Sequence, residues 1–231
     1  MRIAIVTTSW PGSEDDPSGH FVRADARQRA REGHTITVVA PDAGGAFGWP
    51  GAAERLRARP YLAFDAAAWI ARGRSRLAHL DVDRVIAHWV VPCAWPIAMR
   101  SPARLEAISH GGDVRLLLGM PSPVRRRVVC AIARRASTWR FASEQLLSDL
   151  LASLDRATRA PLTLVASIQA PPIELPDVRE DIALKRRDLV GRRVAVSAGR
   201  LVPGKRVDLA VRHLASGRDA DILIVVGDGP E

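Results

Sequence analysis

The sequence predicts an α/β fold built on a parallel sheet. Short apolar or β-branched runs alternate with longer helix-like stretches through most of the 231 residues. These runs are nearly continuous in apolar character, as expected for strands that helices cover on both faces. A further strand, helix and strand follow a proline-rich break after residue 170. We therefore expect a Rossmann-like parallel sheet, followed by a partial second Rossmann-like domain.

The elements of the first sheet follow from this alternation. Its predicted strands are Arg2–Thr7, Thr35–Val39, Val85–His88, Glu106–Ser109, Arg140–Ala142 and Leu162–Val165. The predicted helices between them are Gly19–Glu32, Ala66–Leu80, Pro92–Met99, Pro123–Ala136 and Ser143–Leu154. Gly33 suits the left-handed conformation just past a helix end. The Ser143 hydroxyl can accept from the free amides of the next helix.

The proline-rich segment Ala170–Pro176 divides the chain. Proline fixes φ and lacks an N–H donor, so this segment is not regular structure. We place the N-terminal domain at residues 1–170, a linker at 171–190 and the beginning of a second domain at 191–231. Two apolar runs, Val194–Val196 and Asp221–Val226, are the expected strands of this second domain.

The bulk properties favour an anionic partner. The formal net charge is +9, carried almost entirely by arginine, since Lys185 and Lys205 are the only lysines. Such an excess suits nucleic acid, a phospholipid surface or a phosphorylated small molecule. No stacking platform or recognition motif for nucleic acid accompanies it, so a nucleic-acid partner is not expected.

The sequence also bears on the compartment. No apolar run is long enough to span a bilayer. The N-terminus turns polar too early for a signal peptide. Cys93 and Cys130 lack metal or redox spacing. We therefore expect a cytoplasmic protein.

The loop Ser9–Gly19 follows the first strand, at the edge where doubly wound sheets bind their ligands. Gly19 permits close backbone approach, and the helix that begins there offers free amides and a positive dipole end to a phosphate. Alternatively, the glycines only allow a tight surface loop. Trp10 could stack on a sugar face, and packing explains it equally well.

Two other strand ends carry histidine. The run Ile108–Val114 places His110 at a strand end, with Gly111 and Gly112 leaving room for a substrate. His88 ends another strand and either lines a pocket or is hydrogen-bonded in place, which we favour. Asp113 either belongs to the pocket or caps the following helix, the ordinary role of Asp there.

The second domain carries cations directly after a strand. The loop Gly199–Lys205 holds Arg200 and Lys205, and the next strand runs into the turn Gly227–Pro230. Together with the opening loop and the His110 motif, this order resembles the family 4 glycosyltransferases, which have GT-B architecture. The resemblance covers essentially the whole chain. It implies transfer of a sugar from a nucleotide-sugar donor to an acceptor hydroxyl, with retention of anomeric configuration.

The resemblance also assigns roles. It places His110 beside the transferred sugar as the catalytic residue, and Arg200 and Lys205 on the donor diphosphate, whose negative charge grows as it leaves. Gly19 would lie near the phosphates. The remaining candidates for the acceptor or sugar pocket are Trp10, His88 and Asp113. One residue departs from the family pattern: Arg206 follows the lysine, where the family usually has glycine.

Neither a cofactor nor a metal is expected. Asp15–Asp16 would suit Mg²⁺, but GT-B enzymes generally neutralise the diphosphate with basic side chains and helix ends, so we favour a solvated acidic turn. The acceptor would be a sugar or a lipid-linked sugar. The helix over residues 122–135 combines five arginines with a Val and Ile stripe. It either contacts the inner face of the membrane peripherally or packs that stripe on the sheet, which we favour.

The family places a Glu-x7-Glu pair well beyond the Gly-Asp-Gly-Pro turn, so the resemblance implies a truncated chain with little or no transferase activity alone. Two other functions remain open. One is a non-catalytic acceptor-binding or interaction module. The other is a nucleotide-sugar epimerase, which shares the two-domain architecture and fits the His110 motif less well.

Overall fold

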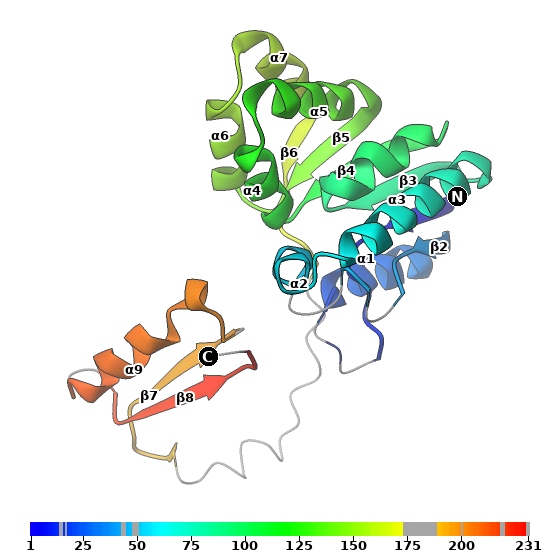
Figure 1. Ribbon diagram of the computed structural model, residues 1–231. Coiled ribbons are helices and arrows are strands. Elements are labelled where there is room, and N and C mark those ends of the chain that lie inside the picture. The colour runs from blue at the N-terminus through cyan, green and yellow to red at the C-terminus, as the bar shows by residue number, and fades with distance from the viewer. Residues whose placement is uncertain are drawn as a thin grey trace. The chain divides into compact units, whose positions relative to one another are not determined.

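The computed structural model describes residues 1–13, 16, 18–42, 45–47, 51–172, 189–199, 201–217 and 220–229. The chain divides into two compact units, Met1–Glu174 (unit 1) and Leu175–Glu231 (unit 2) (Figure 1). Each unit is described by itself.

Unit 1 is built on a six-stranded sheet in the order β2-β1-β3-β4-β5-β6, and every neighbouring pair is parallel. The strands are β1 (Arg2–Val6), β2 (Thr35–Val39), β3 (Arg84–His88), β4 (Arg104–Ser109), β5 (Ala136–Phe141) and β6 (Ala166–Ile168). The predicted α/β class with a parallel sheet is therefore confirmed.

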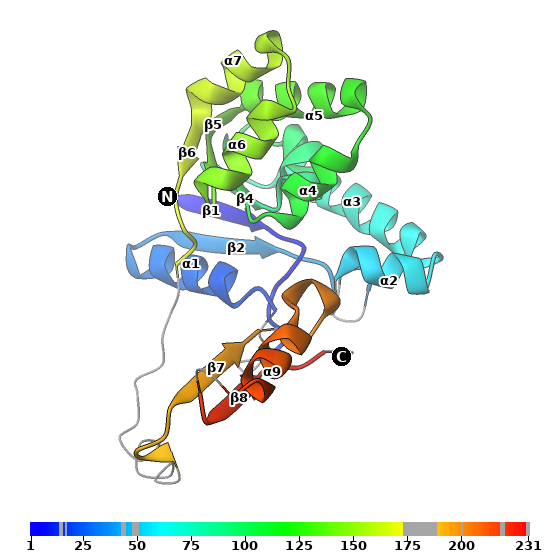
Figure 2. The ribbon, with the colours of Figure 1, turned by 90° about the vertical axis from the view of Figure 1, so that its left-hand side faces the viewer.

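The helices cover the two faces of this sheet unequally. They are α1 (His20–Arg31), α2 (Ala52–Ala58), α3 (Leu62–His79), α4 (Gly112–Gly119), α5 (Ser122–Arg135), α6 (Glu144–Ala152) and α7 (Arg156–Val165), with the irregular η1 (Val90–Ile97) and the short η2 (Ala98–Arg100). The chain leaves β1 in one direction along the sheet and proceeds from β3 to β6 in the other. Right-handed crossovers therefore place α1 on one face and the later helices on the opposite face (Figure 2).

Both faces of the sheet are packed. Alternate residues of a strand point to opposite faces, so Trp139 and Phe141 of β5 enter the larger core beneath α5 and α7, and both are fully buried. The smaller core under α1 contains Ile5 and Ile86 of the sheet and Val22 of the helix. Burial on both faces explains why the strand sequences are continuously apolar.

The prediction of a strand at Leu162–Val165 is wrong, because α7 continues through Val165 and β6 follows it. The Asp155 side chain caps α7 by accepting from the Thr158 amide at 2.8 Å. Helical spacing then buries Leu162 completely and leaves Leu164 87% exposed. A strand covered on both faces would have buried both leucines.

Other local predictions differ in detail. The predicted helix at Pro92–Met99 is irregular, because Val91 and Trp95 are extended, the conformation that a following proline imposes. The helix-end predictions are confirmed. Gly33 has φ 83° just past α1, and the Ser143 side chain accepts from the Leu146 amide at the start of α6.

The arginine-rich helix α5 packs its apolar stripe into the core, where Val128, Val129 and Ile132 are buried. Arg125 donates to three main-chain oxygens, and Arg126 pairs with Asp155 at 2.8 Å. Of the two alternatives for this helix, the structure therefore supports packing on the sheet. Among the described helices, none has both the length and the apolar character that a membrane span needs.

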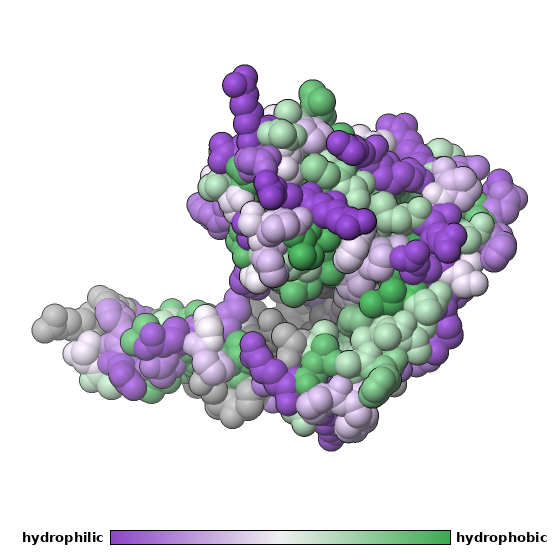
Figure 3. Space-filling view, turned by 45° about the horizontal axis from the view of Figure 1, so that its top comes forward, coloured by the Kyte–Doolittle hydropathy of each residue, from purple (hydrophilic) through white to green (hydrophobic). Residues whose placement is uncertain are grey.

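The described part of unit 2 contains two parallel strands, β7 (Val194–Ala198) and β8 (Ile222–Val226), joined through the short η4 (Pro203–Lys205) and α9 (Val207–Ala215). None of its described residues is buried. On the face shown in Figure 3, hydrophilic side chains are spread over the surface, with hydrophobic ones between them.

Candidate functional site

The carboxyl ends of β1, β3 and β4 form the edge of unit 1 at which a ligand is expected. The strand order reverses between β1 and β3, since β1 leads to β2 on one side while the chain continues from β3 on the other. Doubly wound sheets bind ligands at such a switch point. His88 ends β3 and His110 directly follows β4, so this edge carries two of the predicted site residues.

His110 lies in an aromatic cluster at this edge. Its ring centroid lies 4.7 Å from that of Phe21, 4.8 Å from that of Trp89 and 5.2 Å from that of His88. Trp10 packs against the same small core as Phe21 and Trp89. The structure thus groups His110, His88 and Trp10, which lie far apart in the sequence, in one region of unit 1.

Trp89 has a strained backbone. Its φ of 58° and ψ of 92° are unusual for a residue with a side chain. Its amide donates to the carbonyl of Ile108 at 3.0 Å, which ties the turn after β3 to β4. Strain of this kind concentrates at functional sites. Residue type and spacing gave no sign of it.

Gly19 occupies the point where the opening loop turns into α1. Its φ is 67°, and a Cβ added there would overlap the carbonyl oxygen of Ser9. The Gly19 carbonyl accepts from the amides of Val22 and Arg23 at 2.9 and 3.1 Å. Loop geometry therefore accounts for a glycine here. Its place near a phosphate stays a prediction.

The acidic turn in this loop has a local role. The Asp16 carboxylate accepts from the amides of Gly12 and Ser18 at 2.9 and 2.8 Å, and these bonds lower its pKa. Asp15 lies outside the described residues. Within the described part of the chain, no group of three or more His, Cys, Asp or Glu side chains is placed to hold a metal ion.

Asp113 organises the turn after β4. Its side chain is almost completely buried and accepts from the amides of Val90, His110 and Gly111 at 2.9, 3.1 and 3.0 Å. Burial raises the pKa of this carboxyl, and the amides oppose that rise. The helix-capping prediction is wrong, because Asp113 lies inside α4 and bonds amides that precede the helix or belong to the turn after β3. Its carboxylate instead holds the backbone around His110.

His88 connects His110 to a buried ion pair. The His88 Nδ1 and His110 Nε2 atoms are 3.0 Å apart. On the other side of the ring, His88 Nε2 lies 3.6 Å from Asp25 Oδ2. Asp25 is paired with Arg29 one turn along α1, at 2.9 Å. Glu106 then faces Arg29, Arg84 and Arg140 and extends these charges across β3, β4 and β5.

Sequence reasoning missed Asp25. A signal was present, since Asp25 is one turn from the apolar Val22 and therefore lies on the buried face of the first helix. A carboxylate on such a face needs a buried partner. His88 and Arg29 supply it.

Burial determines the charge states at this site. It lowers the pKa of His110 to about 3, with further lowering by His88 and Arg140. Burial also lowers the pKa of His88, against the attraction of Asp25. For Asp25, burial alone would raise the pKa, but His88 and Arg29 outweigh it and lower the pKa to about 2. Near neutral pH, both histidines are therefore uncharged and Asp25 is ionised.

In unit 2, the basic loop and the glycine turn are hydrogen-bonded to each other. The amide of Leu201 donates to the carbonyl of Asp228 at 2.9 Å. A Cβ added at Gly227 or Gly229 would overlap the carbonyl of Gly199 or Leu201, respectively. Close backbone approach thus explains both glycines of the Gly-Asp-Gly turn.

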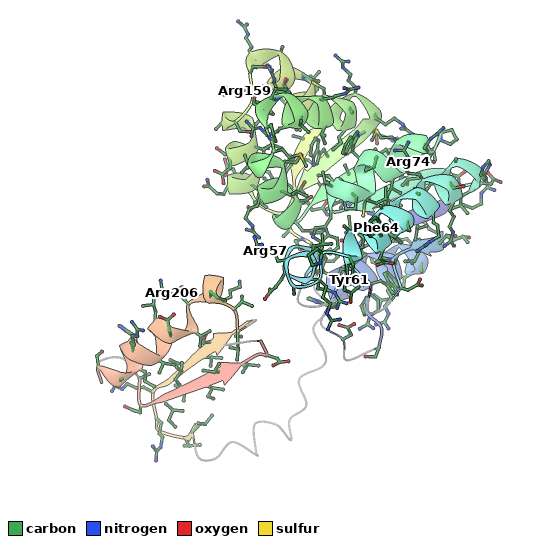
Figure 4. All side chains as sticks on the ribbon, in the orientation of Figure 1. Arg57, Tyr61, Phe64, Arg74, Arg159 and Arg206 are labelled. Atoms are coloured by element: carbon green, nitrogen blue, oxygen red, sulfur yellow. The ribbon has the colours of Figure 1, made fainter. Side chains whose placement is uncertain are left out.

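The cations of the basic loop differ in their exposure and in their ion pairs. Lys205 is exposed at the end of η4, while Arg200 lies outside the described residues. Arg206, labelled in Figure 4, has φ 51° and pairs with Asp208 at 3.0 Å. A left-handed φ is a conformation that glycine adopts without strain and that a residue with a side chain rarely adopts.

No protein-family model matches the chain, and no curated protein matches it in sequence. Solved structures do match. HepE of Anabaena in complex with UDP and glucose has a TM-score of 0.60 and 14% identity, over 99% of this chain and 61% of that one. The HepE complex with UDP-glucose gives 0.59 and 15%. The apo lipopolysaccharide outer core galactosyltransferase WaaB gives 0.54 and 15%, over 100% of this chain and 62% of that one.

At this identity, the likeness shows the fold alone. It covers nearly the whole chain and confirms the predicted α/β fold of GT-B type. This chain spans about three fifths of the length of the matched proteins.

Proposed function

We propose that this chain belongs to a retaining, family 4-like glycosyltransferase, in which unit 1 takes the acceptor and unit 2 contributes to binding of the nucleotide-sugar donor. The observation that carries the proposal is the setting of His110. It lies at the carboxyl end of β4, among Phe21, Trp89 and His88, on a fold that is similar to that of a galactosyltransferase.

The setting of His110 suits a sugar. The ring is neutral near pH 7 and partly exposed, and two aromatic side chains lie beside it. Aromatic faces pack on the apolar faces of sugars, and an uncharged imidazole nitrogen can hydrogen-bond a hydroxyl. A neutral ring also adds no charge that would oppose the positive charge developing at the anomeric carbon.

The proposed donor is a nucleotide sugar with a uridine diphosphate. The matched HepE structures contain UDP, UDP with glucose, or UDP-glucose. In this chain, Arg200 and the exposed Lys205 are the proposed diphosphate contacts, because cations placed there favour departure of the anionic leaving group. Gly19 and the start of α1 are proposed as further phosphate contacts. No cofactor or metal enters the proposal.

Binding of the donor nucleotide tests this proposal. Titration of the chain with UDP and UDP-glucose should give saturable heat. Lys205→Ala should weaken UDP binding about tenfold, the worth of one charged hydrogen bond. Arg212→Ala is the matched control, since it removes an exposed cation of α9, and should change binding less than twofold. Absence of UDP binding at millimolar concentration would refute the donor assignment.

We further propose a lipid-linked acceptor approached at an anionic membrane surface. The support lies at the start of α3, where Tyr61 and Phe64 are 63% and 82% exposed one turn apart, near Arg57 and Arg59 of the preceding helix end (Figure 4). Exposed aromatic rings beside cations suit a membrane interface. The chain should sediment together with vesicles that contain phosphatidylglycerol, and Phe64→Ser should reduce the sedimented fraction several-fold. Leu164→Ser, at another exposed apolar position, should not. Equal loss in both variants would refute the assignment.

A further inference from the structure

We infer that Asp25 and His88 are positioning residues that hold His110 as the tautomer with its proton on Nε2, which leaves Nδ1 as a hydrogen-bond acceptor. The use of that acceptor on a substrate hydroxyl rests on the proposed function. The tautomer itself does not, because it follows from contacts within unit 1.

The first step concerns the proton on His88. Its Nε2 lies 3.6 Å from Asp25 Oδ2 and has no hydrogen-bond partner among the described residues. An ionised carboxylate offers only lone pairs. A bare Nε2 would turn its own lone pair toward that negative oxygen in a buried setting, which is unfavourable. The proton of a neutral His88 therefore belongs on Nε2, where the N–H points its positive end toward Asp25.

The second step shows how the position of the proton on His88 determines its position on His110. A neutral imidazole has one N–H, so protonation of Nε2 leaves His88 Nδ1 as an acceptor. That atom is 3.0 Å from His110 Nε2, and the two ring planes differ by only 5°. The near-parallel planes and the short distance suit a hydrogen bond between the ring nitrogens. His110 Nε2 must then donate.

The third step gives the consequence for His110. Its single ring proton is on Nε2 and is donated to His88 Nδ1, so Nδ1 of His110 carries no proton. No described residue hydrogen-bonds to this atom, and the ring is partly exposed. The lowered pKa values of both histidines, caused first by burial, agree with one proton on each ring.

The Asp25 carboxylate, which determines the proton position on His88, is itself held in place. Arg29 donates to Asp25 Oδ2 at 2.9 Å, and the side chain of Asp25 is 8% exposed. Arg29 in turn faces Glu106 at 3.7 Å. Because α1 and the sheet fix both ends, Asp25 presents its oxygen to His88 from a constant direction.

An unprotonated Nδ1 restricts the groups that His110 can hydrogen-bond. It accepts from a hydroxyl, and it cannot donate to a carbonyl or phosphate oxygen through that atom. His110 would therefore read a hydroxyl of the bound sugar, and a deoxy sugar at that position would leave the acceptor unpaired. A diphosphate oxygen is excluded as its partner.

The test is the tautomeric state in the full chain, measured without any ligand. Long-range proton–nitrogen correlation spectra of the chain labelled with ¹⁵N-histidine distinguish the two tautomers and the imidazolium. Single His→Gln variants assign the signals of His88 and His110. At pH 7.5 we expect the Nε2–H form on both rings, in about tenfold excess or more. A proton on His110 Nδ1 would overturn the inference.

Variants test the roles of the positioning residues. Asp25→Ala should leave both rings as mixtures of tautomers, whereas Asp25→Asn, whose amide oxygen still accepts, should largely restore the Nε2–H form. Asp155→Asn removes another carboxylate of an ion pair, at the N-cap of α7, and should change neither ring. Unchanged tautomers in Asp25→Ala would overturn the role of Asp25.

If Asp25→Ala fails to fold, His88→Leu provides the second variant, since it removes the acceptor of the His110 proton. His110 should then become a mixture of tautomers, and an unchanged Nε2–H form would overturn the role of His88. Because all these measurements omit the donor and acceptor, absence of UDP binding would refute the donor assignment of the proposed function and leave the tautomer assignment standing.

Discussion

Unit 1 and unit 2 begin from similar local sequences and reach different degrees of burial. In unit 1, six parallel strands lie between α1 and the helices of the opposite face, and Ile5, Ile86 and Trp139 are completely buried. In the described part of unit 2, two strands carry one helix, and no residue is buried. Val196 and Val226, in apolar runs typical of an internal strand, are 64% and 54% exposed.

The comparison shows that an apolar run predicts a strand but does not by itself ensure that the strand is buried. Burial requires neighbouring strands and helices on both faces, which the internal strands β1, β3, β4 and β5 have and which β7 and β8 lack in the described residues. Two strands bury too little area to repay the entropy of ordering them. Unit 1 should therefore account for most of the stability of the chain.

The largest expected effect is seen when the units are separated. Residues 1–174 should unfold in urea in one cooperative transition at nearly the midpoint of the full chain, measured by circular dichroism. Residues 175–231 should show no cooperative transition, because their described part has no buried core. A sigmoidal unfolding transition in residues 175–231 would contradict the assignment of most of the stability to unit 1.

A matched pair of truncations measures the same difference within the full chain. Trp139→Ala removes a fully buried ring whose Nε1 donates to the Ser109 hydroxyl at 3.0 Å. It should lower the free energy of unfolding by about 3–5 kcal/mol. Leu209→Ala, on the half-exposed side of α9, should cost less than about 1 kcal/mol. Equal costs in urea titrations would refute the assignment of stability to unit 1.

Acid should destabilise unit 1 through its buried histidines. His110 has a pKa lowered from 6.5 to about 3 in the folded chain, so the unfolded chain binds the proton first as the pH falls. This part of the stability is complete above pH 6.5 and is lost toward pH 3. His110→Gln should reduce the slope of stability against pH in that window by up to about 1.4 kcal/mol per pH unit.

The control for this pH series is Leu164→Gln, which adds the same side chain at an exposed position and removes no titrating group. Its slope should equal that of the native chain. A native slope retained in His110→Gln would show that acid acts on other groups. These include His88, whose pKa is also lowered by burial, and Asp25, whose contribution is lost as the pH falls from 3.8 toward about 2.

The smallest effect concerns a helix cap. Ser143→Ala removes the side-chain acceptor for the Leu146 amide at the start of α6 and should cost about 1 kcal/mol. Ser75→Ala, at an exposed position inside α3, should be neutral or slightly stabilising, because alanine is the better helix former. Urea midpoints measured in parallel compare the two. A loss in Ser75→Ala as large as that in Ser143→Ala would contradict the capping role.

The sequence by itself determined the elements whose signals are local. The apolar runs of β1 to β4 predict strands, and Gly33 and Ser143 predict helix ends, because continuous apolar runs, left-handed φ and capping are visible in a few neighbouring residues. The same signals predict which strand ends carry histidine. The alternation of apolar runs with helix-like stretches predicted the α/β class, and the resemblance of the whole pattern to a known family predicted the GT-B type.

Only the tertiary structure decided what depends on distant partners. The run at Leu162–Val165 is helical because Asp155 caps it and helical spacing buries Leu162 against the core. Asp113 accepts from the amides of His110 and Gly111 in its own turn and from the amide of Val90, which follows a different strand. Asp25, His88 and His110 meet because α1, β3 and β4 bring them together. Charge state and tautomer depend on burial and on such partners, so they emerge only when the chain is folded.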